Sequence, residues 1–201
     1  MGLFKRLLKS NKDSDSSSKK KSGKSKYFPQ EKLPIDEQFT YNFRKNGGKF
    51  VYCVDHQELL DGFDNILLEN DWYEQDVFCL DTELESKFEG FNLNFNKKTS
   101  SKFFLTSCES LVANDGSILL SSNQMKEKKL PEMPYNFVIF AKTSQFVDTI
   151  SEGLRKIKNK SQGRIPSNIT TIKDFETEKE KDFMSYGSST KNLYLLLLED
   201  L

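Results

Sequence analysis

The sequence is poor in the groups from which most catalytic and metal sites are built. It has one histidine, His56, and three cysteines that stand far apart, with no CxxC pair. One histidine cannot supply a usual Ser-His-Asp array or a histidine-rich metal site. The cysteines offer no iron–sulfur ligand pattern, so the sequence identifies no cofactor and no metal site. Because no complete catalytic constellation is present, whether the chain is an enzyme stays open.

Long apolar runs are missing too. No stretch approaches the roughly 18 apolar residues of a membrane-spanning helix, and no hydrophobic signal segment is visible. We therefore expect a cytoplasmic protein with reduced thiols. Cys53 and Cys79 lie in apolar runs, and Cys108 has no histidine nearby in sequence, so all three are expected to be buried packing residues. His56 stands at a predicted helix start and is expected to be solvated.

The formal net charge is zero, but the charges are unevenly spread. Residues 1–26 hold nine basic and two acidic residues, whereas the rest of the chain holds 21 basic and 28 acidic residues. An acidic body is not typical of nucleic-acid-binding domains, and the basic segment has no interleaved aromatic residues with which to read a sequence. We expect no specific nucleic-acid partner.

Composition divides the chain into three parts. Residues 1–9 form a short amphipathic segment, with apolar residues on one helical face and basic residues beside it. Residues 10–32 are a basic Ser/Lys-rich linker that is expected to be disordered, because most of it has no apolar side chain to bury. Residues 33–201 are expected to form one α/β domain. The first 26 residues either make weak contact with an anionic membrane surface, leaving the protein peripheral there, or are a solubilising terminus.

Helix and strand patterns alternate along the domain. We predict four helices. The first runs from residue 35 to a stop at Gly47-Gly48, and the second begins at a capping pair of Asp55 and Glu58. The third covers residues 81–87, and the fourth runs from a Ser144 cap through Ile157. Strands are predicted at 49–54, 77–80, 91–95, 135–141, 169–172 and 193–198. Several of these strands are apolar on both faces, as in a parallel sheet with both faces covered. The expected fold class is therefore α/β, three-layered, with a mainly parallel sheet and a hairpin.

The most informative stretch covers residues 106–123. Its pattern predicts two short strands joined by a tight turn. Asp115-Gly116 can take the positive φ angles that such turns require. Hydroxyl residues cluster at the outer ends of the strands, where hydroxyls and turn amides can bind a phosphate or carboxylate. The candidate ligand-binding residues here are Thr106, Ser107, Glu109, Asp115, Gly116, Ser117, Ser121, Ser122 and Asn123. The alternative is an ordinary hairpin with solvated ends.

Two further candidates are a carboxylate and a loop. Glu109 could act as a nucleophile or general base, with Asp115 as a coupled carboxylate, or it could be a solvated strand residue. Residues 185–191 combine small residues with a lysine before a buried strand, so Gly187, Ser188 and Lys191 could cradle an anion. This loop matches neither a Walker loop nor a dinucleotide fingerprint, and its alternative is a flexible connector.

Two of these pieces resemble the LUD domain, the family of lactate utilization protein C. Residues 106–122 resemble its Thr-Gly-acidic start, small-apolar strand, acidic-Gly-Thr/Ser turn and Leu-rich, Ser-Ser strand, while residues 186–200 resemble its closing Gly-rich segment and final strand ending in acidic residues. The resemblance spans about residues 35–201. It implies the fold of the sugar-phosphate isomerase and coenzyme A transferase-like superfamily. It also implies a role in cytoplasmic L-lactate oxidation beside iron–sulfur partner subunits.

These observations give three hypotheses of function. The first is an accessory or metabolite-binding subunit of organic-acid (L-lactate) utilization, in which residues 106–123 and 185–191 form one site for a small polar metabolite. The second is a transferase- or isomerase-like enzyme that uses Glu109 or Asp115 on a phosphorylated or coenzyme A-linked substrate. The third is a non-catalytic adaptor that residues 1–26 tether to a membrane or partner.

Overall fold

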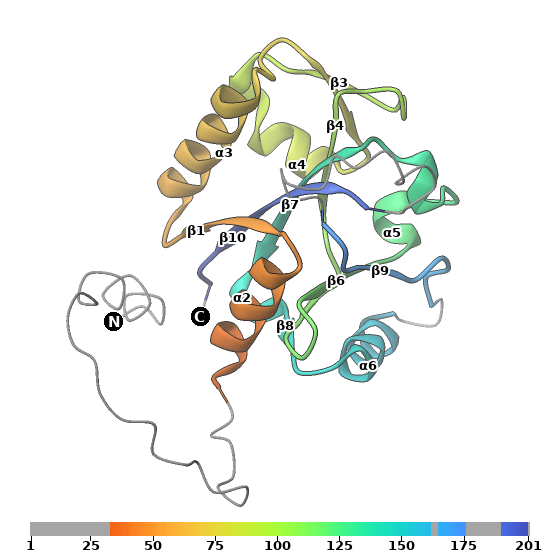
Figure 1. Cartoon of the computed structure of the whole chain (residues 1–201). Coiled ribbons are helices and arrows are strands. Elements are labelled where there is room, and N and C mark those ends of the chain that lie inside the picture. The colour runs from red at the N-terminus through yellow and green to blue at the C-terminus, as the bar shows by residue number, and fades with distance from the viewer. Residues whose placement is uncertain (1–32, 162–164, 176–189, 201) are drawn as a thin grey trace, which may run out of the picture. The chain divides into compact units, whose positions relative to one another are not determined.

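The computed structural model describes residues 33–161, 165–175 and 190–200. Within these ranges the strands form two sheets (Figure 1). The larger sheet is parallel throughout and has the order β1-β10-β7-β4-β2-β3. Its strands are β1 (Lys49–Cys53), β2 (Asp76–Cys79), β3 (Asn94–Asn96), β4 (Phe103–Ser107), β7 (Asn136–Lys142) and β10 (Asn192–Leu198). Strand β10 confirms the predicted internal strand near the end of the chain. Strand β3 lies at the edge as predicted, but it begins at Asn94 and not at Phe91, which belongs to a 3₁₀ turn.

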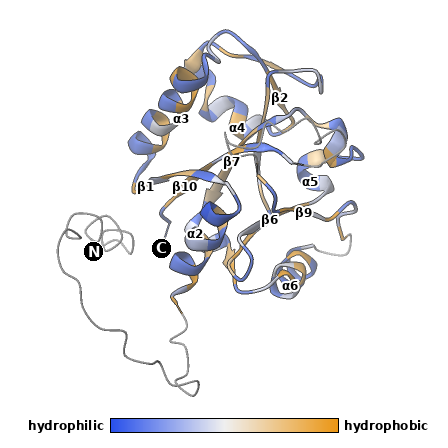
Figure 2. Cartoon of the chain, viewed as in Figure 1, coloured by the Kyte–Doolittle hydropathy of each residue, from blue (hydrophilic) through white to orange (hydrophobic). Residues whose placement is uncertain are grey.

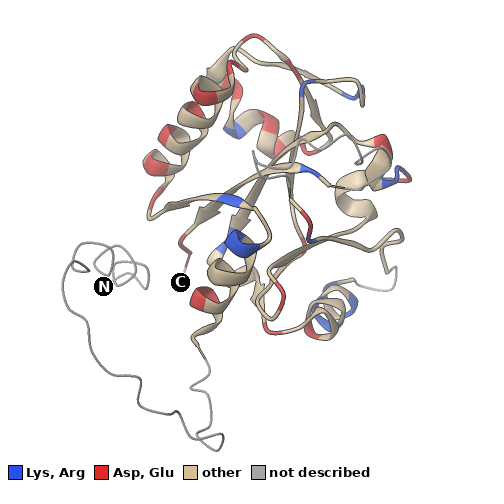
Figure 3. Cartoon of the chain, in the orientation of Figure 1, with Lys and Arg blue, Asp and Glu red and all other residues tan. Residues whose placement is uncertain are grey.

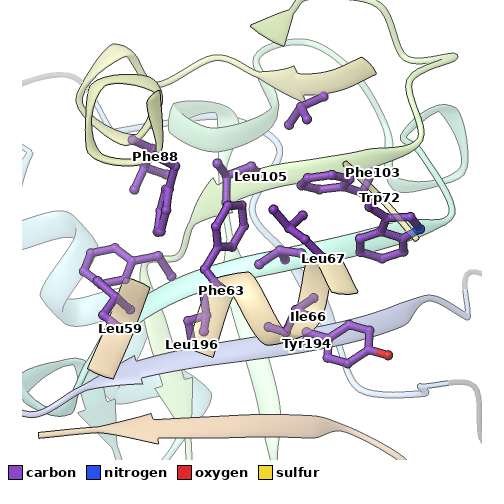
Figure 4. Close-up of a cluster of buried hydrophobic side chains, with 14 of the residues drawn as sticks. Leu59, Phe63, Ile66, Leu67, Trp72, Phe88, Phe103, Leu105, Tyr194 and Leu196 are labelled. Atoms are coloured by element: carbon purple, nitrogen blue, oxygen red, sulfur yellow. The ribbon is translucent and has the colours of Figure 1, made fainter. Parts of the chain in front are cut away.

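Helices α3 (His56–Asn70) and α4 (Thr82–Lys87) cover one face of this sheet. The predicted apolar face of α3 is confirmed, because Leu59, Phe63, Ile66 and Leu67 are buried against side chains from β4 and β10 (Figure 4). The predicted Asp55–Glu58 capping pair is also confirmed: the Glu58 amide donates to the Asp55 carboxylate at 2.9 Å. Such caps satisfy amides that a helix start leaves without partners.

The opposite face of the large sheet is covered as well. Successive side chains of a strand point to opposite faces, and the alternate residues Phe104, Phe137 and Leu195 are also 0% exposed. Hydrophobic residues therefore run along the central strands (Figure 2). Figure 1 shows α3 and α4 on one side of the sheet, and α2, the smaller sheet and α6 on the other. The predicted three-layer α/β class with a mainly parallel sheet is confirmed.

The smaller sheet has the order β8-β5-β6-β9. The predicted hairpin is its centre: β5 (Ser110–Val112) pairs antiparallel with β6 (Ser117–Leu120). Strand β8 (Phe146–Val147) pairs parallel with β5, and β9 (Thr170–Ile172) pairs antiparallel with β6. Thr106 and Ser107, which the sequence placed in the hairpin, instead close β4 of the large sheet.

The remaining elements connect the sheets. They are α2 (Ile35–Lys45), α5 (Ser122–Met125), α6 (Ile150–Lys160) and the short 3₁₀ helices η1 (Glu89–Phe91), η2 (Leu130–Glu132) and η3 (Thr143–Gln145). Helix α2 begins and ends as predicted. Its buried residues Phe39 and Phe43 stack at 5.2 Å, and Gly47 takes a φ of 89° just after the helix.

The predicted helix from a Ser144 cap was wrong at its start. Ser144 lies in η3, and the helix α6 is instead capped by Thr149, whose side chain accepts from the Glu152 amide. Phe146 and Val147 are extended because they pair with β5, and the Phe146 ring packs 5.2 Å from that of Phe39. These contacts with distant parts of the chain override the local helical periodicity.

Two predicted segments fall outside the described residues, the amphipathic segment at 1–9 and the linker at 10–32. Within the described ranges, no helix is long and apolar enough to cross a membrane.

Candidate functional site

The topology of the large sheet points to the carboxyl ends of β2 and β4. These strands are neighbours, but the next strands of the large sheet along the chain lie on opposite sides of them: β3 beside β2, and β7, which follows the hairpin of the smaller sheet, beside β4. Connections that diverge in this way open a crevice beyond the carboxyl ends of the two strands, where open α/β sheets bind ligands. This edge is therefore the candidate position for a ligand site.

A pocket of about 400 Å³ lies in this crevice. Its wall is strongly polar and includes acidic, basic and amide side chains. The lining residues are Asp81, Glu83, Leu84, Lys87, Ser107, Cys108, Glu109, Asn123, Gln124, Phe140, Lys142, Gln145 and Lys160. They come from the starts of α4 and α5, the ends of α4, β4, β7 and α6, and the segments that follow β2, β4 and β7.

Glu109 is the most firmly held acidic group of the pocket. Its Oε1 accepts hydrogen bonds from Ser121 Oγ at 2.6 Å and from Asn123 Nδ2 at 2.8 Å. Its backbone amide donates to the Leu119 carbonyl at 2.8 Å, which extends the β5–β6 ladder by one residue. Ser121 also accepts from the Asn123 amide as the cap of α5. The orientation of this carboxylate is thus fixed by residues just before β5 and just after β6, at the open end of the hairpin.

The basic groups are Lys87, Lys142 and Lys160, which end α4, β7 and α6 respectively. The Lys87 ammonium lies 5.6 Å from the ring centroid of Phe140 on β7. Phe140 and Lys142 are two residues apart on the same strand, so they point to the same face of the sheet. Lys87 and Lys142 are therefore neighbours in the pocket wall.

Gln145 joins the two segments that form the floor of the pocket. Its Nε2 donates to the Cys108 carbonyl at 2.6 Å, after β4, while its Oε1 accepts from the Lys142 amide at 2.8 Å, at the end of β7. A side-chain amide that satisfies both a carbonyl and an N–H fixes the distance between the two strand ends. Gln145 thus holds these two parts of the pocket wall together.

The cysteines are packing residues, as predicted. Cys53, Cys79 and Cys108 are all buried, and Cys108 is 5% exposed although it borders the pocket. Burial raises the pKa of Cys53 to about 12 and that of Cys79 to about 11, and it raises the pKa of Cys108 further. Because the thiolate is the nucleophilic form, none of the three is poised for nucleophilic chemistry.

Part of the predicted site comes together around Glu109. Ser107 and Asn123 line the pocket with it, and Ser121 supports its carboxylate. Thr106 is buried one residue before the pocket, and its hydroxyl donates to the Ser107 carbonyl at 3.2 Å.

Ser122 faces another part of the chain. Its amide donates to the Ser167 carbonyl at 2.8 Å, and its hydroxyl accepts from the Ser167 amide at 3.0 Å. These bonds join the start of α5 to the segment that precedes β9, so the structure gives Ser122 a structural contact instead of a place in the pocket wall.

Asp115, Gly116 and Ser117 lie at the other end of the hairpin from Glu109. Asp115 Oδ1 accepts from the Ser117 amide and hydroxyl, at 3.1 and 2.7 Å, and its carbonyl accepts from Asn46. These contacts close the turn and dock it on α2 and the residue that follows it. The predicted coupling of Glu109 with Asp115 is therefore not found, because the two carboxylates stand at opposite ends of the hairpin.

Lys191, the candidate residue of the 185–191 segment that the structure describes, does not line the pocket. Lys191 precedes β10, at the amino edge of the parallel sheet, whereas the pocket lies at the carboxyl edge. Its ammonium is buried and donates to the carbonyls of Met133 and Pro134, both at 3.1 Å. Gly187 and Ser188 lie outside the described residues. Lys191 thus stands apart from the candidate site.

Sequence reasoning missed the basic side of the pocket. Lys87, Lys142 and Lys160 end ordinary surface elements, and a lysine at such a place is usually solvated. For Lys142 there was a usable signal, since it directly follows the predicted strand at 135–141. Residues at this position of a parallel strand face the ligand-binding edge. For the two helical lysines the sequence held no such signal.

Comparison with known proteins gives the family. The sequence model of the LUD domain matches residues 37–197, whereas no curated protein matches the chain. Among solved structures, that of a DUF162 family protein from Deinococcus radiodurans is similar, with a TM-score of 0.56 and 12% sequence identity. The match covers 83% of this chain and 96% of that one, and at such low identity it shows the shared fold alone. The resemblance drawn from the sequence is confirmed, and the chain belongs to the LUD domain family.

Proposed function

We propose that this protein is a metabolite-binding subunit of organic-acid utilization whose pocket holds a small hydroxy acid, with L-lactate as the expected example. One observation carries the proposal: an oriented carboxylate, Glu109, shares a pocket with neighbouring ammonium groups, Lys87 and Lys142, at the ligand-binding edge of the sheet. Membership of the LUD domain family supports the organic-acid role.

The two kinds of group suit the two ends of a hydroxy acid. An ammonium group forms charge-assisted hydrogen bonds with a carboxylate. The Glu109 carboxylate can only accept, so it favours a ligand that offers a hydroxyl proton. Two donors already hold its Oε1, which keeps the acceptor in place before a ligand arrives. A keto acid would bring oxygen lone pairs against Glu109 instead of a proton and would bind less tightly.

Binding can be tested by calorimetry with L-lactate and pyruvate, which differ in this hydroxyl. We expect lactate to bind more tightly than pyruvate. Glu109→Gln should reduce that preference, and Lys142→Ala should weaken both ligands. Lys45→Ala, an exposed lysine outside the pocket on α2, is the matched control and should leave both affinities unchanged. A folded protein that binds neither acid would contradict the proposal.

The physiological role requires a second experiment. Oxidation of lactate needs an electron acceptor, which an iron–sulfur partner subunit would supply. A strain lacking the gene should grow normally on glucose and poorly on L-lactate. The wild-type gene should restore growth on lactate, and the Lys142→Ala gene should not, at equal protein levels. Normal growth of the deletion strain on lactate would argue against this role.

The fixed position of Glu109 favours one alternative, a transferase- or isomerase-like enzyme acting on a phosphorylated or coenzyme A-linked substrate. A positioned carboxylate in a pocket can serve as a general base or as a nucleophile. Ribose 5-phosphate, and acetyl-coenzyme A together with L-lactate, are suitable probes. Turnover that disappears in Glu109→Gln, with an unchanged Tm, would support the enzyme. A wild-type protein that turns over neither probe would count against it.

A further inference from the structure

We propose that the pocket takes a hydroxy acid with a second anionic group, so that its preferred ligand is a dianion and not a monocarboxylate. The inference rests on the proposed function, because it places the hydroxy-acid end of the ligand at Glu109, Lys87 and Lys142. What it adds is a separate anion subsite at Lys160, which reaches the pocket from the end of α6.

The positive charges of the pocket lie in two places. Lys87 and Lys142 are neighbours beside Phe140, on the face of the sheet that α4 covers. Lys160 ends α6, which packs on β5 and β8 of the smaller sheet. Figure 1 shows α4 and α6 well apart, with strands between them. A single carboxylate at the first pair leaves the charge of Lys160 without a ligand partner.

Of the three acidic residues of the pocket wall, Asp81, Glu83 and Glu109, the first and the last have hydrogen-bond donors on their carboxylates. Asp81 Oδ1 accepts from the Glu83 and Leu84 amides at the start of α4, at 3.0 and 3.4 Å. Glu109 Oε1 accepts from two side chains. These contacts stabilise the negative charges within the protein, so neither carboxylate depends on a pocket lysine for a partner.

The ammonium groups are less well satisfied. The Lys160 ammonium forms no hydrogen bond or ion pair with another residue in the described part of the chain. Lys142 has the Asp200 carboxylate in its electrostatic neighbourhood, but Ser144 and Thr143 already donate hydrogen bonds to that carboxylate. Helix α6 adds to the positive field, because basic residues dominate its second half (Figure 3). Anionic groups of a ligand are the natural complement.

The size of the pocket agrees with a ligand larger than lactate. Its volume of about 400 Å³ falls within the range of roughly 300–1,000 Å³ that holds drug-sized ligands. Lactate alone would leave most of this volume to water, with no group to reach from Glu109 to Lys160. A longer acid that carries a charge at each end would span both subsites.

L-lactate and L-malate form a matched pair of probes, because malate is lactate with a second carboxylate in place of a methyl hydrogen. By calorimetry on the full chain, we expect malate to bind at least about tenfold more tightly than lactate, the effect of one added charge-assisted contact. Adding 3-phospho-L-glycerate, a hydroxy acid of the same configuration with a phosphate at its far end, distinguishes the two sources of the second charge. Tighter binding than malate would identify a phosphate subsite, and weaker binding a carboxylate subsite.

The Lys160→Ala variant tests the location of the subsite. It should bring the affinity for malate down to that for lactate measured in the same variant, so that the preference for malate is lost. Lys158→Ala is the matched control, since Lys158 is also exposed in the last turn of α6 but does not line the pocket. It should keep the preference for malate.

The outcomes separate this inference from the proposed function. Equal affinity of the wild type for lactate and malate would overturn the dianion subsite and leave the hydroxy-acid pocket standing. A preference for malate that survives in Lys160→Ala would also overturn it. If the folded protein bound none of the three acids, the proposed function itself would fail, and the inference with it.

Discussion

Gly116 shows how a single residue fixes the hairpin that carries Glu109. It has a φ of +69°, and a Cβ there would lie 2.4 Å from the Phe43 amide nitrogen and 2.5 Å from the Asn42 carbonyl carbon. Both are backbone atoms of α2, which cannot move aside cheaply. We predict that Gly116→Ala lowers the free energy of unfolding by about 2 kcal/mol or more, measured by urea denaturation.

Gly90→Ala is the control for this substitution. A Cβ at Gly90 meets nothing within 4 Å, and the residue does not have a positive φ. Its replacement should change the free energy of unfolding by no more than about 0.5 kcal/mol. If both alanine variants unfold at the same urea concentration, the hairpin does not depend on close packing between its turn and α2.

Lys191 provides a prediction about pH. Burial lowers the pKa of its ammonium from 10.5 to about 8. Between these two values the unfolded chain binds more protons than the folded one, so the stability contributed by this residue rises with pH. We predict that the wild type gains on the order of 1–2 kcal/mol relative to Lys191→Met between pH 7 and pH 10. Urea unfolding of both proteins at the two pH values gives this difference, in which the other titrating groups cancel. A difference that does not change with pH would contradict the prediction.

At the scale of elements, Asp200 ties the end of β10 to the end of β7. Thr143 Oγ1 and the Ser144 amide donate to Asp200 Oδ1 at 3.0 and 2.9 Å, and Ser144 Oγ donates to Oδ2 at 2.7 Å. Burial alone would raise the pKa of Asp200, but the hydrogen bonds from Ser144 and Thr143, with the charge of Lys142, lower it. Its ionised form therefore stabilises the fold above the ordinary carboxylate pKa, and this contribution is lost as the pH falls through the lowered value.

We predict that Asp200→Asn lowers the free energy of unfolding at pH 7, by less than about 1 kcal/mol because the side chain is exposed. The loss should shrink at pH 3, which lies below the ordinary pKa of 3.8, because the stabilising contribution of the ionised carboxylate falls as the pH drops toward the lowered value. Chemical denaturation at the two pH values measures this, with Glu127→Gln, an exposed acid, as the control. An equal loss at both pH values would show that the charge of Asp200 does not matter.

The elements that sequence reasoning located are those fixed by local pattern. The apolar spacing of α3, the Asp55 cap and the double-sided apolar run of β10 each lie within one segment, so each could be recognised there. The smaller sheet could not be predicted as a unit. Its strand β8 has only two residues, and they are extended because they pair with β5, some 35 residues earlier. No short window of sequence contains that information.

The residues of the candidate site divide in the same way, into those that one segment of sequence reveals and those that only the fold brings together. Glu109, Ser107, Ser121 and Asn123 were found because they share one stretch of sequence with a recognisable hairpin. Lys87, Lys142 and Lys160 were missed because the sheet order brings them to the pocket from three separate segments. Asp115 was placed in the site by its closeness in sequence, although the hairpin holds it at the far end. Sequence distance within a hairpin is thus a poor guide to which groups meet.

At the scale of the whole molecule, charge is divided between the parts of the chain. Residues 1–26 carry a net charge of +7 and the remainder a net charge of −7. Helix α3 illustrates the second part, since its charged residues are all acidic (Figure 3). The two parts should therefore respond differently to an anionic surface, which attracts the first and repels the second.

We predict that the full chain binds vesicles containing anionic phosphatidylserine and that a chain beginning at Tyr27 does not. Each basic residue near such a surface contributes on the order of 1 kcal/mol, and apolar residues among the first nine add burial in the interface. Cosedimentation should show binding that weakens as salt is raised, because exposed charges are screened. Neutral phosphatidylcholine vesicles are the control and should bind neither chain. Equal sedimentation of both chains with anionic vesicles would rule out the first 26 residues as the membrane contact and assign any contact to the α/β domain.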